Sequence, residues 1–176
     1  FDPVTEAFTK FLNNYEESGN LSHSAVTALY VDRGGVLWVG TKKGLNKYDS
    51  YSKDFEVFKT ASFDKSRSIL TGIQGSLKSG YWISTIGGGL YRLKDDKFQH
   101  LSFNDTGNAF INFIKTLFVD TWGNVWLGTD GAGVYRFDEK TLQGKNNSIV
   151  DFDHFHSHSA TPINDDFIMS IEEDNR

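Results

Sequence analysis

Cysteine is absent from the 176 residues and proline occurs only twice. Without cysteine the chain is not a disulfide-stapled scaffold, and a domain of this length can bury a core without such bonds. No apolar run reaches the length of a membrane span, so we expect no direct membrane insertion by this segment. Positive charge is also scarce, since 18 Lys and Arg face 23 Asp and Glu. The net charge of −5 argues against nucleic acid as a partner.

Aromatic residues and glycine are abundant, with 15 Phe, 7 Tyr, 4 Trp and 17 Gly, and this composition favours β structure. Three tryptophans recur at one interval, because Trp38, Trp82 and Trp126 lie 44 residues apart. The sequence around them also recurs, as LWVGTKKGLNKYD, YWISTIGGGLYRL and VWLGTDGAGVYRF. A constant period of this length indicates tandem structural repeats.

Each repeat contains four short β-like segments separated by turn residues. In the first repeat we expect strands over residues 25–31, 36–41, 45–49 and 54–59. Turns are expected at Asp32-Arg-Gly-Gly35 and at Lys42-Lys43-Gly44, where glycine takes a positive φ without strain. Four short strands per unit, repeated in tandem, predict an all-β fold, namely a β-propeller segment of three four-stranded antiparallel blades plus partial flanking strands.

The repeat phase predicts where the blades begin and end. We expect the outer strand of a preceding blade (Phe8–Phe11) and a linker over 1–23, blade 1 over 24–59, blade 2 over 60–103, blade 3 over 104–160 and the first strand of a following, truncated blade over 161–176. A long loop, 140–148, precedes the last strand of blade 3. Because propellers typically have at least four blades, the expected partners are the remaining blades of a parent propeller, with self-association or a dimer through the exposed strand edges.

The stretch Asp32-x-x-Gly35-x-Leu-Trp38-Val-Gly-Thr41, followed by Gly44-Leu, resembles the two-component regulator propeller repeat. Residues 120–135 are similar. The resemblance implies the periplasmic sensor region of a hybrid two-component histidine kinase of Bacteroidetes type, the extracytoplasmic part of an inner-membrane protein. It implies carbohydrate sensing, with an oligosaccharide as the ligand, no cofactor, no enzyme activity in this segment and a kinase outside it. Two alternatives remain: a structural or protein-interaction propeller that mediates dimerisation, and a polysaccharide-active propeller enzyme.

The repeated residues themselves favour structural roles. Trp38, Trp82 and Trp126 are expected in the core between blades, since a ligand platform would not recur in every unit. Asp32 and Asp120 are expected to cap turns through hydrogen bonds to the backbone, and so is Asp174 in the incipient fourth copy. Functional residues should therefore be sought where the repeats differ.

In propellers, ligands usually meet the loops that enter each blade and the loops that join its second and third strands. Polar side chains there suit hydroxyl-rich or uronate-bearing ligands, although ordinary polar loops have the same composition. The candidate ligand-binding residues in these loops are Lys42, Lys43, Arg67, Asn104, Asp105, Asn112 and Asp130. Trp122 is a further candidate in a turn on the opposite face, where an exposed indole could stack on a sugar or a protein partner, or pack locally over the turn.

His154, His156 and His158 alternate, so on an extended strand they share one face and could offer three imidazoles to a metal. The alternative, which we favour, is a solvated and pH-sensitive edge with no metal. We identify no catalytic residues. No Gly-x-Ser-x-Gly motif is present, and neighbouring carboxylates such as Asp95 and Asp96 point to opposite faces of a strand.

Overall fold

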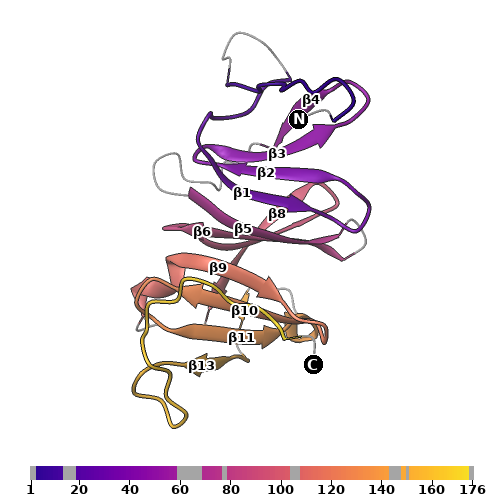
Figure 1. Ribbon diagram of the computed structural model, residues 1–176. Coiled ribbons are helices and arrows are strands. Elements are labelled where there is room, and N and C mark those ends of the chain that lie inside the picture. Colours follow the sequence, from indigo (N-terminus) through magenta and orange to yellow (C-terminus); the bar gives the residue numbers. More distant parts are fainter. Residues whose placement is uncertain are drawn as a thin grey trace.

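The computed structural model describes residues 3–13, 19–58, 69–76, 79–103, 108–142, 148–149 and 151–174. Three antiparallel sheets follow one another along the chain and stack face to face (Figure 1). We call them blades 1, 2 and 3. This arrangement confirms the predicted all-β class with three blades of four antiparallel strands.

The strands occur in chain order within each blade. Blade 1 contains β1 (Val26–Val31), β2 (Leu37–Thr41), β3 (Gly44–Asp49) and β4 (Asp54–Phe58). Blade 2 contains β5 (Ile69–Ser76), β6 (Gly80–Ile86), β7 (Gly89–Lys94) and β8 (Lys97–Phe103). Blade 3 contains β9 (Ile114–Val119), β10 (Asn124–Thr129), β11 (Val134–Asp138) and β13 (Asp153–Phe155), and the 3₁₀ turn η1 (Ala109–Asn112) precedes it.

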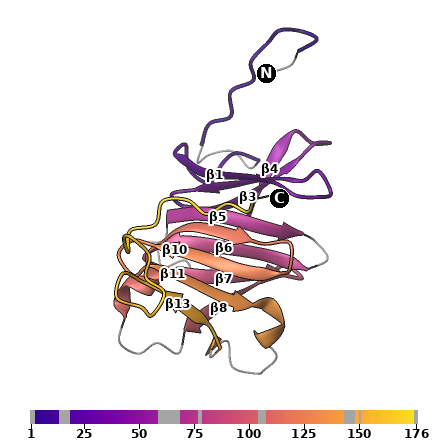
Figure 2. The same ribbon diagram turned by 60° about the horizontal axis from the view of Figure 1, so that its bottom comes forward.

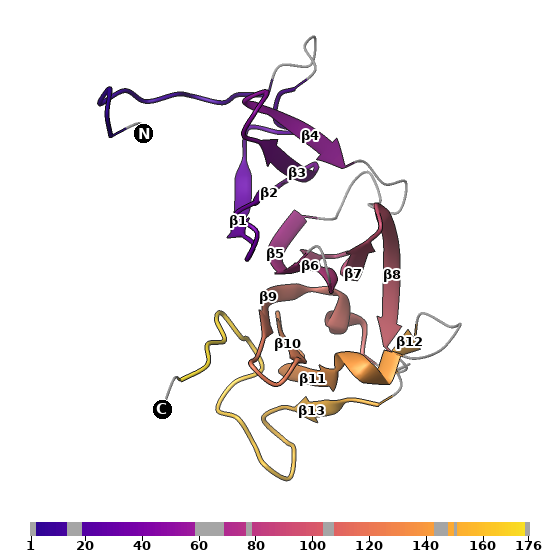
Figure 3. The same cartoon turned by 90° about the vertical axis from the view of Figure 1, so that its right-hand side faces the viewer.

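The first strands of the three blades, β1, β5 and β9, lie along one side of an arc (Figure 3). Equivalent backbone positions join neighbouring blades: Gly75 N–H donates to the Tyr30 hydroxyl at 3.2 Å, and Val119 N–H donates to Gln74 Oε1 at 2.5 Å. The two acceptors, Tyr30 and Gln74, occupy the same position in successive repeats, and so do the two donors, Gly75 and Val119. The sequence period is therefore also the period of the contacts between blades.

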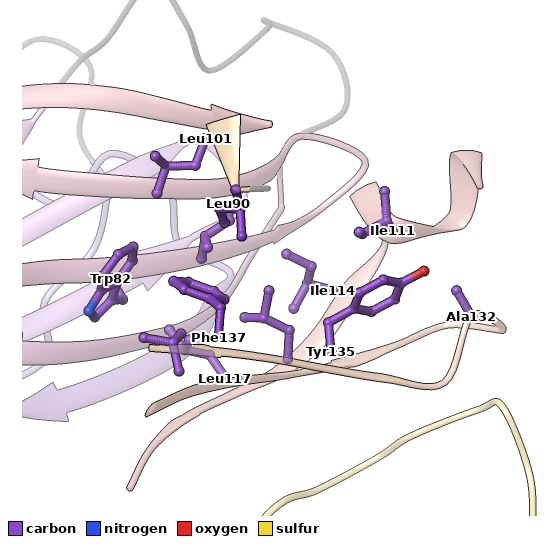
Figure 4. Packing of buried hydrophobic residues seen from close by; sticks show 12 residues of the cluster. Trp82, Leu90, Leu101, Ile111, Ile114, Leu117, Ala132, Tyr135 and Phe137 are labelled. Atoms are coloured by element: carbon purple, nitrogen blue, oxygen red, sulfur yellow. The ribbon is translucent and has the colours of Figure 1, made fainter. Parts of the chain in front are cut away.

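The core lies between blades. Trp38 and Leu45 of blade 1 pack with Leu70, Ile73 and Tyr81 of blade 2, and all five side chains are buried. Between blades 2 and 3, a second cluster places Trp82, Leu90 and Leu101 opposite side chains of blade 3 (Figure 4). Its labelled members from blade 3 and η1 are Ile111, Ile114, Leu117, Ala132, Tyr135 and Phe137. Each blade is thus stabilised mainly by burying apolar surface against the next one.

Two of the repeated tryptophans are core residues as predicted, since Trp38 and Trp82 are each 2% exposed. Trp126 is only half-buried, and its ring stacks on Phe155 of the same blade with centroids 6.1 Å apart. The equivalent rings contact the next blade, Trp38 through Tyr81 and Trp82 through Phe137.

The expected strand over Phe8–Phe11 is not formed, because residues 8–13 have no regular secondary structure. A strand requires a paired neighbour, and the described chain provides none on that side of blade 1. The start of the described chain projects away from the blade (Figure 2). The Phe11 ring instead contacts Tyr48 and Phe55 of blade 1, with centroids at 5.8 and 5.2 Å.

The long loop of blade 3 contains structure that the sequence did not predict. It forms the 3₁₀ turn η2 (Glu139–Leu142) and the short strand β12 (Ser148–Ile149). β12 pairs in parallel with β8, so blade 2 becomes a five-stranded sheet. Ile149 is 1% exposed and Glu139 forms an ion pair with Arg92 of blade 2. The loop therefore fastens blade 3 to the outer edge of blade 2.

The C-terminal segment, residues 166–174, lies against blade 3 where the first strand of a following blade would be. Ile168 N–H donates to Thr129 O at 2.9 Å, and Phe167 forms a β-bridge with Asp130. The same kind of bridge joins Ile86 of blade 2 to Phe113 at the start of blade 3. A Cβ atom on Gly128 would lie 2.5 Å from Ile168, so only glycine allows this close approach.

Candidate functional site

Two of the three turn aspartates, Asp32 and Asp120, cap their turns as the sequence predicts, whereas the residues that follow Asp174 lie outside the described part of the chain. Asp120 Oδ1 accepts hydrogen bonds from the N–H groups of Trp122 (3.1 Å) and Asn124 (2.8 Å). Its other oxygen, Oδ2, accepts from Trp126 Nε1 and from the Asn124 amide, both at 2.8 Å. Burial alone would raise the pKa of Asp120, but the donors around it outweigh burial and the pKa is lowered.

Asp32 has the same role in blade 1. Its Oδ1 accepts from the N–H groups of Gly34 and Val36, while its Oδ2 accepts from the hydroxyl of Tyr81 in blade 2. Burial raises the pKa of Asp32, but the bonds from Tyr81 and the backbone prevail and lower it. The pKa of the Tyr81 hydroxyl is raised by burial and by its bond to Asp32. These saturated carboxylates are structural and leave no free oxygen for chemistry.

The loops that enter the blades and the turns between second and third strands lie at one end of the strands, which we call the entering-loop rim. Of the candidates assigned to it, Lys42, Lys43, Asn112 and Asp130 are described. Arg67, Asn104 and Asp105 lie outside the described residues. Lys42 and Lys43 are exposed in the β2–β3 turn of blade 1.

Asn112 and Asp130 come from consecutive parts of blade 3 and are brought together by backbone bonds. Asn112 O accepts from Gly87 N–H at 2.8 Å, and Asp130 N–H donates to the next carbonyl, Phe113 O, at 2.9 Å. The Asp130 carboxylate pairs with Lys115 Nζ at 2.8 Å. The β6–β7 turn, η1 and the β10–β11 turn therefore meet at one place on the rim.

Sequence reasoning missed three residues of this rim. Lys115 holds Asp130 in place, and the exposed rings of Phe110 and Phe113 lie with centroids 6.2 Å apart. In a chain with 15 phenylalanines, no signal distinguishes these two from core residues. Amide, carboxylate, ammonium and aromatic groups side by side can bind a polyhydroxylated ligand through hydrogen bonds and ring stacking.

Trp122 lies at the opposite end of the strands, in the β9–β10 turn, and is 75% exposed. It lines a groove of about 330 Å³ together with residues of blades 1 and 2, including Tyr30, Arg33 and Gln74. The exposed setting agrees with the prediction of an exposed turn tryptophan on the face opposite the entering loops. The structure thus separates Trp122 from the other candidate residues.

The three histidines follow one another along the outer edge of blade 3, with ring centroids 4.7 and 6.5 Å apart. His154 stacks on Tyr135 at 4.1 Å and its Nε2 contacts Ala132 O at 2.7 Å, so its ring is engaged in packing. His100 contacts Gly88 O and Tyr91 in the same way in blade 2. In the part of the chain that the structure describes, no group of three His, Cys, Asp or Glu residues is placed to hold a metal ion.

Residues 20–43, which contain the first turn aspartate and the first repeated tryptophan, match the family described as two component regulator propeller. This match identifies one two-component regulator propeller repeat within the chain. This identification confirms the resemblance drawn from the sequence. A relative of 31% identity over 93 residues is Histidine kinase P4 of Formosa agariphila, and the match covers 49% of this chain and 7% of that protein.

Solved structures share the fold of these propeller repeats. The extracellular domain of BT4673 from B. thetaiotaomicron, a proposed hybrid two component system, superposes with a TM-score of 0.68 at 21% identity, over 88% of this chain and 20% of that one. The extracellular domain of BT3049 from the same organism, also a proposed hybrid two component system, gives a TM-score of 0.62 at 20% identity, over 97% and 27%. The chain thus spans about a quarter or less of the length of these relatives.

None of the helices among the described residues is long and apolar enough to cross a membrane.

Proposed function

We propose that this chain is a segment of the extracytoplasmic sensor propeller of a two-component regulator, that it does not catalyse a reaction, and that it recognises an oligosaccharide. The observation that carries the proposal is the propeller repeat over residues 20–43, in a fold shared with extracellular domains of hybrid two component systems. The relative from Formosa agariphila, itself a histidine kinase, supports a kinase elsewhere in the parent protein. The corresponding location is the periplasmic side of an inner membrane.

The entering-loop rim is the proposed ligand face. Asn112 offers an amide, the Lys115–Asp130 pair offers both charges, and Phe110 presents an exposed ring. A sugar bound here would contact both the β6–β7 turn of blade 2 and the β10–β11 turn of blade 3, because the backbone bonds of Gly87 and Asp130 bring them together. Binding would then favour one packing of neighbouring blades over another, which is how a ligand shifts a conformational equilibrium.

The remaining blades of a parent propeller are the proposed partners. Leu29 in β1 is 68% exposed, whereas the residues at the same repeat position, Ile73 and Leu117, are 4% and 7% exposed. Val26 is likewise exposed where Leu70 and Ile114 are fully buried. The side chains that bury these positions in blades 2 and 3 belong to the preceding blade. An apolar face of this kind on blade 1 therefore fits another blade of the same repeat.

Binding to sugars tests the proposal. Calorimetric titration of the intact protein with maltohexaose, laminarihexaose, xylohexaose and tetragalacturonate should give saturable heat with at least one of them. The recovered sugar should be unchanged by chromatography. The double variant Asn112→Ala with Asp130→Ala should weaken binding at least tenfold, since it removes the directed polar groups of the rim. Cleavage of the sugar, or no binding to any probe, would contradict the proposal.

A second candidate function is a propeller that joins protein chains. The exposed Val26, Leu29 and Val31 of blade 1 favour it, because a contiguous apolar strand face is also suited to a second protein molecule. Light scattering of the intact protein distinguishes the two functions. Association that depends on concentration and on Leu29, without binding of any sugar, would favour the joining role over ligand recognition.

A further inference from the structure

The groove beneath Trp122 lies at the opposite end of the strands from the entering-loop rim, and we call it the Trp122 groove. Its walls come from all three blades: Tyr30 and Arg33 from blade 1, Gln74 from blade 2, and Thr121 and Trp122 from blade 3. A volume of about 330 Å³ is at the small end of the range for ligand sites. It has room for one or two sugar rings rather than a long chain.

Trp122 presents an indole ring from a fixed backbone. The backbone N–H of Trp122 donates to Asp120 Oδ1, and the backbone N–H of Gly123 donates to Asp120 O at 3.1 Å. These two hydrogen bonds close the turn. The side chain is nevertheless 75% exposed and makes no ring contact with a described aromatic residue. Blade 1 has Gly34 at this position of the turn, so the tryptophan is a departure from the repeat.

Hydrogen-bond donors lie on the other walls of the Trp122 groove. Arg33 is exposed and has no ion pair with a described carboxylate, so its guanidinium can donate to a ligand. The amide oxygen of Gln74 is occupied by Val119 N–H, and its NH₂ group remains as a donor. The Tyr30 hydroxyl both donates to and accepts from Gly75, which makes it a fixed wall.

We propose that the Trp122 groove is a saccharide-binding subsite, in which the apolar face of a pyranose ring stacks on Trp122 and its hydroxyl groups accept hydrogen bonds from Arg33 and Gln74. A flat aromatic ring beside directed donors is the arrangement that a pyranose requires, because the sugar has apolar faces and polar edges. The subsite rests on the proposed function, since it assumes that the protein recognises an oligosaccharide. It lies apart from the entering-loop rim.

The Trp122 groove is joined to the C-terminal segment through the residue next to the tryptophan. Thr121 N–H donates to Glu173 Oε2 at 3.1 Å, and Thr121 Oγ1 donates to Glu173 Oε1 at 2.8 Å. Glu173 belongs to the segment that occupies the first-strand position of a following blade. A sugar bound on the β9–β10 turn would therefore also stabilise the docking of this segment against blade 3.

Quenching of tryptophan fluorescence by iodide tests the subsite in the intact protein. Trp38 and Trp82 are buried and Trp126 is half-buried, so Trp122 dominates the accessible fluorescence of this segment. The difference in quenching between the protein and Trp122→Phe isolates its signal. Saturating sugar, chosen from the same four probes, should protect that signal. Trp122→Ala should weaken at least tenfold the affinity of the Trp122 groove, which calorimetry resolves as a second set of sites beside the entering-loop rim. Arg33→Gln should weaken it several-fold.

The matched control is Tyr51→Ala, because Tyr51 is a 97% exposed aromatic residue of a turn that does not line the groove. It should bind sugar like the unchanged protein. One outcome separates the two proposals. If a sugar binds, the double variant Asn112→Ala with Asp130→Ala abolishes that binding, and Trp122 is neither protected from iodide nor needed for affinity, the proposed subsite is contradicted. The proposed function then stands. If no probe binds, the proposed function itself fails. A change in self-association on Trp122→Ala, without protection by sugar, would assign the indole to a protein contact instead.

Discussion

Trp126 Nε1 donates a 2.8 Å hydrogen bond to Asp120 Oδ2, which ties the repeated tryptophan to the repeated turn aspartate of the same blade. In blade 1 the corresponding oxygen of Asp32 is bonded instead by Tyr81 of the next blade. The Oδ2 atom of the turn aspartate therefore accepts a hydrogen bond from its own blade in blade 3, and from the next blade in blade 1. These bonds give the first three predictions.

Asp120→Asn should destabilise the fold by about 1–3 kcal/mol, because an amide has only one oxygen and cannot accept all four hydrogen bonds of the carboxylate. Denaturant unfolding followed by tryptophan fluorescence measures the change. Asp151→Asn, at an exposed position, is the control and should be neutral within experimental error. Equal stability of the two variants would contradict a capping role for Asp120.

Acid should weaken the fold through Asp32 and Asp120. The pKa of each is lowered below the ordinary value of 3.8, so near that value the unfolded state binds more protons than the folded state. Their contribution to stability is complete above about pH 4 to 5 and is lost as the pH falls through the lowered folded pKa. Unfolding curves between pH 6 and pH 3 should show this loss, and Asp120→Asn should reduce its size. An unchanged acid dependence in that variant would contradict the assignment.

Tyr81→Phe should cost about 1–3 kcal/mol, since it leaves the buried Asp32 Oδ2 without its donor while it keeps the ring in the core. Thermal unfolding checks it, with Tyr51→Phe as the control at an exposed tyrosine. The loss should appear in the unfolding of blades 1 and 2 together, because the bond joins them. A neutral Tyr81→Phe would mean that solvent replaces the hydroxyl.

Ile149→Ala should destabilise the fold by about 2–4 kcal/mol, although Ile149 lies in a two-residue strand within a long loop. Its side chain is 1% exposed and belongs to the cluster between blades 2 and 3. Leu12→Ala, at a half-exposed leucine near the start of the chain, is the control and should cost less than about 1 kcal/mol. Similar effects of both changes would argue that β12 does not fasten the two blades.

The repeat made the blades predictable from sequence, because every strand lies between turn residues at a constant spacing. The predictions from sequence were wrong or incomplete for segments that occur only once in the chain, or that have no neighbouring strand or blade to pack against. Phe8–Phe11 matches an outer strand in sequence but has no neighbour to pair with, and β12 arises from an insertion that pairs with a different blade. Trp126 matches Trp38 and Trp82 in sequence, yet it is only half-buried, because its ring packs against Phe155 of its own blade and not against a neighbouring blade as the other two do.

The candidate site was less predictable than the fold. Sequence spacing assigned Asn112 and Asp130 to one rim and Trp122 to the opposite one, which the geometry agrees with. Arg33 and Gln74 were not candidates, because a groove formed by turns of three blades is a relation in space that no local pattern records. Phe110 and Phe113 were missed because exposure, rather than residue type, distinguishes them.

The central claim is that this chain is an arc of a larger propeller, and labelling at Leu29 tests it most directly. The sequence has no cysteine, so Leu29→Cys, Ile73→Cys and Tyr51→Cys each introduce one thiol in this segment. In the intact protein, the maleimide labelling rate at position 29 should be as slow as at the buried position 73 and far slower than at position 51. Labelling at position 29 as fast as at position 51 would contradict the account, because the apolar face of blade 1 would then be open to solvent.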